Sequence, residues 1–158
     1  MYTSPTATPE YLDGSEVPIT FDREDHPPRV PRPGHSPLVL DAQICDFDMS
    51  RVFMDGGSGL NILFASTVRK MCISLENLAP TETTFHSVEP GQSIVPMGKL
   101  HLDVVFGTPS NFRREKLEFE VVDWPSQYHA ILGRPAYARF MMVPHYAYLK
   151  VKIPGKDG

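Results

Sequence analysis

The segment Val52–Phe64 places an acid and a hydroxyl beside glycines at the end of an apolar strand. It reads VFMDGGSGLNILF, so Asp55 ends the strand and Gly56, Gly57 and Ser58 follow it. A carboxylate in such a place has to be hydrogen-bonded or paired, because ionising a desolvated acid is costly. The glycines let the chain turn sharply and bring backbone N–H groups close to the carboxylate. The turn could hold a catalytic acid at the mouth of a cleft, or Asp55 could simply cap a following helix.

Two further segments could complete such a site. In His129–Pro135, two branched apolar residues run into Gly133, and a glycine there would let another segment approach the backbone closely. An ordinary corner between a strand and a helix has the same pattern. Residues 85–98 predict a hairpin with a polar tip that contains Gly and Pro. That hairpin could close over a cleft as a lid, or it could be a plain exposed hairpin.

The elements that would position these segments are mainly strands. Apolar residues at three- and four-residue steps over Leu60–Met71 predict an amphipathic helix of about three turns. Arg134–Phe140, with a proline just inside, predicts a short helix. Apolar runs or alternation predict hairpins at residues 37–55 and 81–98 and strands at 99–106, 114–124, 128–133 and 146–154. About seven or eight strands with two helices predict a mainly β domain with a closed or rolled sheet.

The chain of 158 residues is expected to hold one folded domain. Residues 1–16 are polar and rich in Pro, Ser and Thr, which predicts a disordered arm. Residues 17–36 are rich in proline and are expected to run as an extended lead-in, in which Val17–Asp22 could form one short strand. Residues 37–155 are expected to form the domain.

Composition argues against several classes of function. The net charge of −4, with both signs mixed, argues against a general nucleic-acid binder. No apolar run approaches the ~20 residues that span a membrane, and the N-terminus lacks the pattern of a secretory signal. Cys45 and Cys72 are too few for a disulfide framework, and the histidines lack metal-ligand spacing. We expect an intracellular, cytoplasmic protein with no cofactor, no metal, and no membrane or nucleic-acid partner.

Taken together, the motif, the hairpin and the later glycine segment resemble a retropepsin-like aspartic protease. The retroviral signature is Asp-Thr/Ser-Gly-Ala/Ser, then a flap, then two aliphatic residues and a glycine, often with arginine next. The matching residues are Asp55, Gly57, Ser58, Ile131, Leu132, Gly133 and Arg134. Longer stretches, including ITFDREDHP, VVFGTPSNFRREKLEFEVV and YHAILGRPAYARFMMVPHYAYLKVKIPG, resemble the protease segment of plant gypsy-type LTR retrotransposon Gag-Pol polyproteins. This resemblance covers residues 17 to 155.

The resemblance implies an aspartic endopeptidase that cleaves a retrotransposon polyprotein as a homodimer. Each subunit would contribute one Asp55, and the two carboxylates would share a proton across the two-fold axis. Gly56, Gly57 and Ser58 would support the catalytic loop, and residues 131–134 would pack behind it. The flap would comprise Phe85, His86, Ser87, Val88, Glu89, Pro90, Gly91, Gln92 and Ser93.

Two departures from the family pattern favour a second function. Gly56 stands where the family usually has threonine or serine, whose hydroxyl bonds across the dimer. No acid follows the motif to pair with Arg134. The alternative is therefore a catalytically silent retropepsin-like module, a remnant of a decayed element that dimerises or binds peptides.

Overall fold

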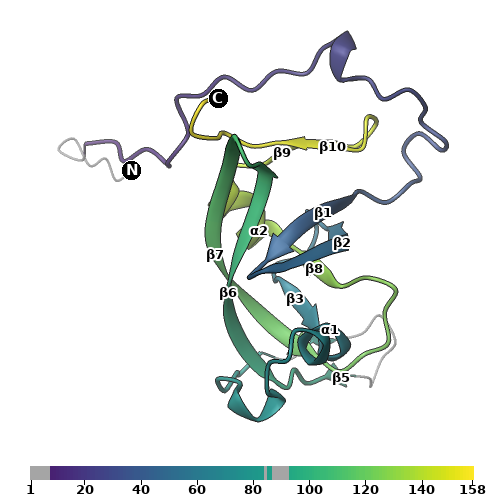
Figure 1. Cartoon of the computed structure of the whole chain (residues 1–158), viewed down its shortest axis with the longest axis vertical. Helices are drawn as coiled ribbons and strands as arrows, with labels where there is room; N and C mark the ends of the chain where they lie inside the picture. The colour runs from purple at the N-terminus through teal and green to yellow at the C-terminus, as the bar shows by residue number, and fades with distance from the viewer. Residues whose placement is uncertain (1–7, 84, 87–92) are drawn as a thin grey trace, which may run out of the picture.

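The main body of the protein is a closed barrel of six strands, in the order β1-β2-β8-β3-β7-β6 (Figure 1). A computed structural model describes residues 8–83, 85–86 and 93–158 of the chain. The barrel strands are β1 (Val39–Ile44), β2 (Phe47–Met54), β3 (Ile62–Phe64), β6 (Gly98–Thr108), β7 (Asn111–Val122) and β8 (Ala130–Leu132). The fold is therefore mainly β with a closed sheet, and this prediction from the sequence is confirmed.

Smaller elements surround the barrel. Two α-helices lie within the described residues, α1 (Ala65–Lys70) and α2 (Arg134–Phe140), with 3-10 turns at Arg23–Asp25 and Leu75–Asn77. Two short antiparallel sheets pair β4 (Phe85–His86) with β5 (Ser93–Ile94), and β9 (Val143–His145) with β10 (Lys150–Lys152). No helix in the described ranges is both long and apolar enough to cross a membrane.

The long β6–β7 hairpin supplies much of the core, and its alternating sequence explains why. Leu102 and Val104 of β6 and Leu117 and Phe119 of β7 point into the barrel and are each 8% exposed or less. Side chains of this size stabilise the fold by about 1.5–3 kcal/mol each when fully buried. The polar residues between them lie on the outer face, as in a sheet with one face in the core.

Strands β2, β3 and β8 bring the residues of the candidate site together. β2 and β8 are parallel neighbours, with Met54 opposite Leu132. β3 lies between β8, to which it is antiparallel, and β7, to which it is parallel. Parallel strands end at the same edge of a sheet, so the residues that follow β2 and β8, Asp55 and Gly133, emerge side by side.

Two local predictions are wrong. The helix predicted over Leu60–Met71 begins only at Ala65, because Ile62–Phe64 pairs with barrel strands on both sides as β3. An apolar strand buried on both faces and then a short helix give the same three- and four-residue spacing as one long helix. No strand forms at Val17–Asp22 either, since that segment contacts the domain through side chains and single backbone groups.

The lead-in segment lies against the β9–β10 hairpin (Figure 1). Beyond this hairpin the chain arches over to the start of β1. Lys152 Nζ donates to the backbone oxygen of Thr20 and pairs with Asp25 Oδ1, both at 2.8 Å. The bond from Lys152 is the main cause that lowers the pKa of the Asp25 carboxyl. Lys152 also lies over the Phe21 ring, which packs on His145 with centroids 5.1 Å apart. The boundaries expected for the arm, the lead-in and the domain stay predictions.

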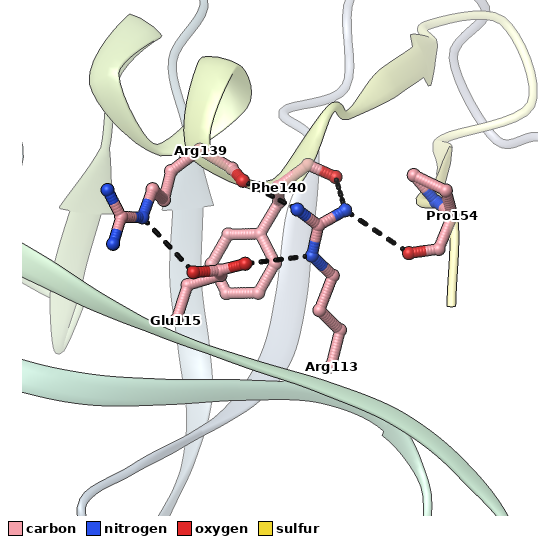
Figure 2. Close-up of polar contacts among 5 residues, drawn as sticks. All are labelled: Arg113, Glu115, Arg139, Phe140 and Pro154. Atoms are coloured by element: carbon pink, nitrogen blue, oxygen red, sulfur yellow. Dashed lines mark hydrogen bonds and ion pairs between the residues drawn. The ribbon is translucent and has the colours of Figure 1, made fainter. Parts of the chain in front are cut away.

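Arg113 of β7 ties α2 and the C-terminal segment to the barrel (Figure 2). Its guanidinium donates to the carbonyl oxygens of Phe140, Pro154 and Arg139 at 3.0 to 3.2 Å. Glu115 accepts from Arg113 at 3.0 Å and from Arg139 at 3.1 Å. The Arg113 side chain is only 12% exposed, so these bonds are shielded from water. This cluster fixes the end of α2, and α2 in turn begins at the candidate site.

Candidate active site

The carboxylate of Asp55 is held in a tight turn at the end of β2. The Asp55 N–H donates to the Leu132 oxygen at 2.8 Å, which continues the β2–β8 pairing by one residue. The Gly57 N–H donates to Asp55 Oδ1 at 3.0 Å, and the Ser58 N–H donates to the Asp55 backbone oxygen at 3.1 Å. Asp55 does not cap α1, because the N-cap of that helix is Phe64. The turn thus orients one half-buried carboxylate and leaves Oδ2 without a bond in the described residues.

Ser58 stabilises the turn from within. Its Oγ donates to the Leu60 oxygen at 2.9 Å and accepts from the Leu60 N–H at 3.2 Å. Both bonds are local, so within the described part of the chain Ser58 serves the turn and does not bond the Asp55 carboxylate. The hydroxyl lies in the loop, one residue beyond the glycine that binds Asp55.

Gly133, at the end of β8, packs directly against the back of this loop. A β-carbon at Gly133 would lie 2.6 Å from the Ser58 oxygen and would also overlap the Leu60 oxygen. The next residue, Arg134, donates its backbone N–H to the Ser58 oxygen at 2.8 Å. The structure therefore brings Asp55, Ser58 and Gly133 together around one turn.

Asn61 joins three parts of the site, and sequence reasoning did not single it out. The residue as a whole is 3% exposed. Oδ1 accepts from the Gly133 N–H at 3.0 Å, and Nδ2 donates to the Glu118 oxygen of β7 at 3.1 Å. One buried amide thus fixes the loop after Asp55 to both β8 and β7. Its position six residues after Asp55 carried no local signal of this long-range role.

The Arg134 guanidinium lies over the loop. Its Nη2 would be 3.4 Å from a β-carbon on Gly59. In the described ranges Arg134 forms no ion pair. This agrees with the absence of an acid directly after the motif.

Two tyrosines that sequence reasoning also missed lie against the turn. The Tyr146 hydroxyl would be 2.8 Å from a β-carbon on Gly56, and Tyr137 Cζ would be 3.9 Å from it. Burial, the Tyr146 hydroxyl and the charge of Asp55, in that order, raise the pKa of Tyr137. The Tyr146 hydroxyl lies close beside the buried Tyr137 hydroxyl, but no contact of the Tyr137 hydroxyl in the described residues meets both the distance and the angle of a hydrogen bond. Tyr146 lies in a segment with several aromatic residues, but nothing in that pattern indicated contact with Gly56.

The described residues include only the base of the predicted flap. β4 and β5 pair antiparallel, with Phe85 opposite Ile94 and His86 opposite Ser93. The expected tip, Ser87, Val88, Glu89, Pro90, Gly91 and Gln92, lies outside the described residues.

The segment that leads into β4 is anchored to the barrel by a buried acid. Glu120 of β7 is 2% exposed, and its Oε1 accepts from the hydroxyls of Thr81 and Thr83 at 3.0 and 2.9 Å. The start of the hairpin is therefore fixed on the same strand that Asn61 contacts. In the described part of the chain, no three His, Cys, Asp or Glu side chains gather closely enough to hold a metal ion.

Comparison with solved structures identifies the fold class. The retroviral protease-like domain of Ddi1 from Leishmania major superposes with a TM-score of 0.55 at 13% identity, over 76% of this chain and 90% of that chain. A retropepsin-like aspartic protease from Rickettsia conorii gives 0.51 at 17% identity, over 68% and 76%. No protein-family model matches the sequence, and no curated protein matches it either. The barrel has the retropepsin-like fold, as the sequence predicted.

Proposed function

We propose that this protein is an aspartic endopeptidase that works as a homodimer through paired Asp55 carboxylates. The observation that carries the proposal is the orientation of Asp55 by the Gly57 N–H in a tight turn at the end of a barrel strand. The retropepsin-like fold supports it, since this turn and the loop packed behind it by Gly133 occur in a barrel of that class.

A single carboxylate does not complete this chemistry. Hydrolysis of a peptide by this route needs one carboxylate as the base on a water and a second, protonated one as the donor to the scissile carbonyl oxygen. Two acids within hydrogen-bond range share one proton because like charges at that distance do not both ionise. The 158 residues contain one Asp-Gly-Gly, and in the proposed homodimer the second acid comes from another copy of the chain. Two-fold symmetry would place the same turn on both sides of the axis.

The substrate class we propose is a polypeptide, namely the retrotransposon Gag-Pol polyprotein that the sequence resemblance implies. The hairpin at residues 85–93 would cover the bound peptide as a flap, and the bonds from Thr81 and Thr83 to Glu120 fix the segment that leads into it. Linkage of several copies through a polyprotein would raise the local concentration and so favour the dimer.

The alternative function is a catalytically silent module that dimerises or binds peptides. Gly56 and the unpaired guanidinium of Arg134 in the described ranges favour it. Digestion of a peptide library by concentrated protein between about pH 4 and 7 discriminates the two. The endopeptidase cleaves best in mildly acidic solution and loses cleavage on Asp55→Asn, whereas Asp46→Asn, on the exposed turn before β2, keeps it. Binding without cleavage by the parent protein would favour the module.

A further inference from the structure

The Tyr146 hydroxyl occupies the space that a side chain on Gly56 would take. It would be only 2.8 Å from a β-carbon there, closer than a carbon and an oxygen approach without bonding. Tyr146 is nevertheless 52% exposed, so the ring has a free face as well as a face on the turn. A hydroxyl therefore stands beside the catalytic turn although residue 56 has no side chain.

The hairpin turn that carries Tyr146 is held in a defined shape. His145 stacks on Tyr148 with ring centroids 3.8 Å apart, and the Tyr148 N–H donates to His145 Nδ1 at 3.1 Å. On either side of the turn, His145 pairs with Lys150 as β9 meets β10. The position of Tyr146 is thus set by the hairpin and not by a long flexible side chain alone.

Tyr137 supports the same arrangement from below. Its hydroxyl is buried, lies beside the Tyr146 hydroxyl, and has no partner in the described residues. A buried donor without a partner costs about 1–3 kcal/mol. The Tyr146 hydroxyl beside it is the polar group that can satisfy this donor, which favours keeping Tyr146 at the turn.

We propose that Tyr146 is a dimer-interface residue whose hydroxyl lies between the two catalytic turns and links them in place of a side chain on Gly56. This inference rests on the proposed homodimer. In the proposed homodimer the two Asp55 carboxylates meet at the two-fold axis. The Cα atom of Gly56 is only ~3.8 Å from that of Asp55 in the same chain, so both Gly56 residues lie close to the axis. A hydroxyl seated on Gly56 would then lie close to the other subunit. Tyrosine is among the residues enriched at such interfaces, and the symmetry makes each contact twice.

The direct test is the dimer dissociation constant of Tyr146→Phe, measured by sedimentation equilibrium. The variant keeps the ring and removes the hydroxyl at both copies of the contact. We expect the dissociation constant to rise about 5- to 100-fold, since two hydrogen bonds are lost. Tyr148→Phe, the same change two residues along the hairpin, is the matched control and should leave the constant within about twofold. An unchanged or lower dissociation constant for Tyr146→Phe would overturn the proposal.

Gly56→Ser is a second test, because its effect on the dimer should change direction with the residue at position 146. General damage to the fold would weaken the dimer in both backgrounds. Gly56→Ser in the parent chain should weaken the dimer, because its β-carbon crowds the Tyr146 hydroxyl. In the Tyr146→Phe background the same change should tighten the dimer, since the space is open and a new hydroxyl is supplied. Gly56→Ser acting in the same direction in both backgrounds would overturn the link. These measurements report dimerisation and do not depend on cleavage. A parent protein that dimerises but does not cleave would contradict the proposed endopeptidase activity and would leave the interface role of Tyr146 unaffected.

Discussion

Gly133 gives the sharpest test of how the site is built, because only steric crowding forbids a side chain there. Its φ of −101° and ψ of −165° suit any residue, so Gly133→Ala introduces no backbone strain. The added methyl group would overlap the Leu60 oxygen and lie 2.6 Å from the Ser58 oxygen. Both atoms belong to the backbone of the loop after Asp55, which has to move away for the methyl group to fit.

The expected loss of stability follows from these contacts. Overpacking costs about 1–3 kcal/mol, and weakening the bonds from the Gly133 and Arg134 N–H groups adds about 1 kcal/mol. A total of about 2–4 kcal/mol lowers the Tm by about 4–16 °C in a domain of this length.

Gly59→Ala is the matched control in the same loop. A methyl group there would meet only Arg134 Nη2 at 3.4 Å, an ordinary contact with the end of a flexible side chain. It should be neutral or stabilise the protein by about 0.4–1 kcal/mol, because it restricts the unfolded chain. Thermal unfolding followed by circular dichroism measures both variants. A Gly133→Ala variant that melts with the parent protein would show that the loop does not pack on β8 as described.

Three further perturbations test the surrounding structure. Arg113→Met removes the bonds to three carbonyl oxygens and should lower the free energy of unfolding, measured in urea, by about 2–4 kcal/mol. The control Arg114→Met, at an exposed position, should lower it by at most about 0.5 kcal/mol. Equal losses for the two variants would contradict the shielded cluster. Asn61→Leu leaves the bonded N–H of Gly133 without its acceptor and should cost about 2–4 kcal/mol in the same assay, while a loss below about 0.5 kcal/mol would show that Asn61 does not tie the strands. Burial lowers the pKa of His129 below its ordinary value of 6.5, and the charges of Lys70 and Arg51 lower it further. The His129 ring is therefore protonated at a higher pH in the unfolded chain than in the folded protein. Stability then falls as the pH drops through 6.5 toward the pKa of His129 in the folded protein. The loss of unfolding free energy between pH 7 and 5 should therefore be smaller in a His129→Asn variant, and equal losses would refute the assignment.

The sequence predicted the local parts of this site. Strand β2 ends where the apolar run meets Asp55, and the glycines after it indicate a turn without help from the rest of the chain. Alternating residues in β6 and β7 specify which face is buried, and Pro135 marks the start of α2. These features depend on periodicity and on backbone preferences, both of which act over a few residues.

The long-range parts could not be predicted. Ile62–Phe64 is a strand only because β7 and β8 lie on either side of it, and its own spacing fits a helix equally well. Asn61 and Tyr146 act through partners that are distant in the sequence, Gly133 and Gly56. A single sequence does not encode such pairs as a readable pattern, so they emerge only from the folded chain.

The central claim is that catalysis needs an Asp55 from each of two subunits, and subunit mixing tests it most directly. Parent protein is mixed with Asp55→Asn protein at a fixed total concentration, high enough for dimers to form and exchange. Because a mixed dimer holds one carboxylate, activity in an equal mixture should fall to about one quarter of that of the parent alone. A fall to about one half, in proportion to the parent chains present, would mean that each subunit cleaves on its own and would contradict the account.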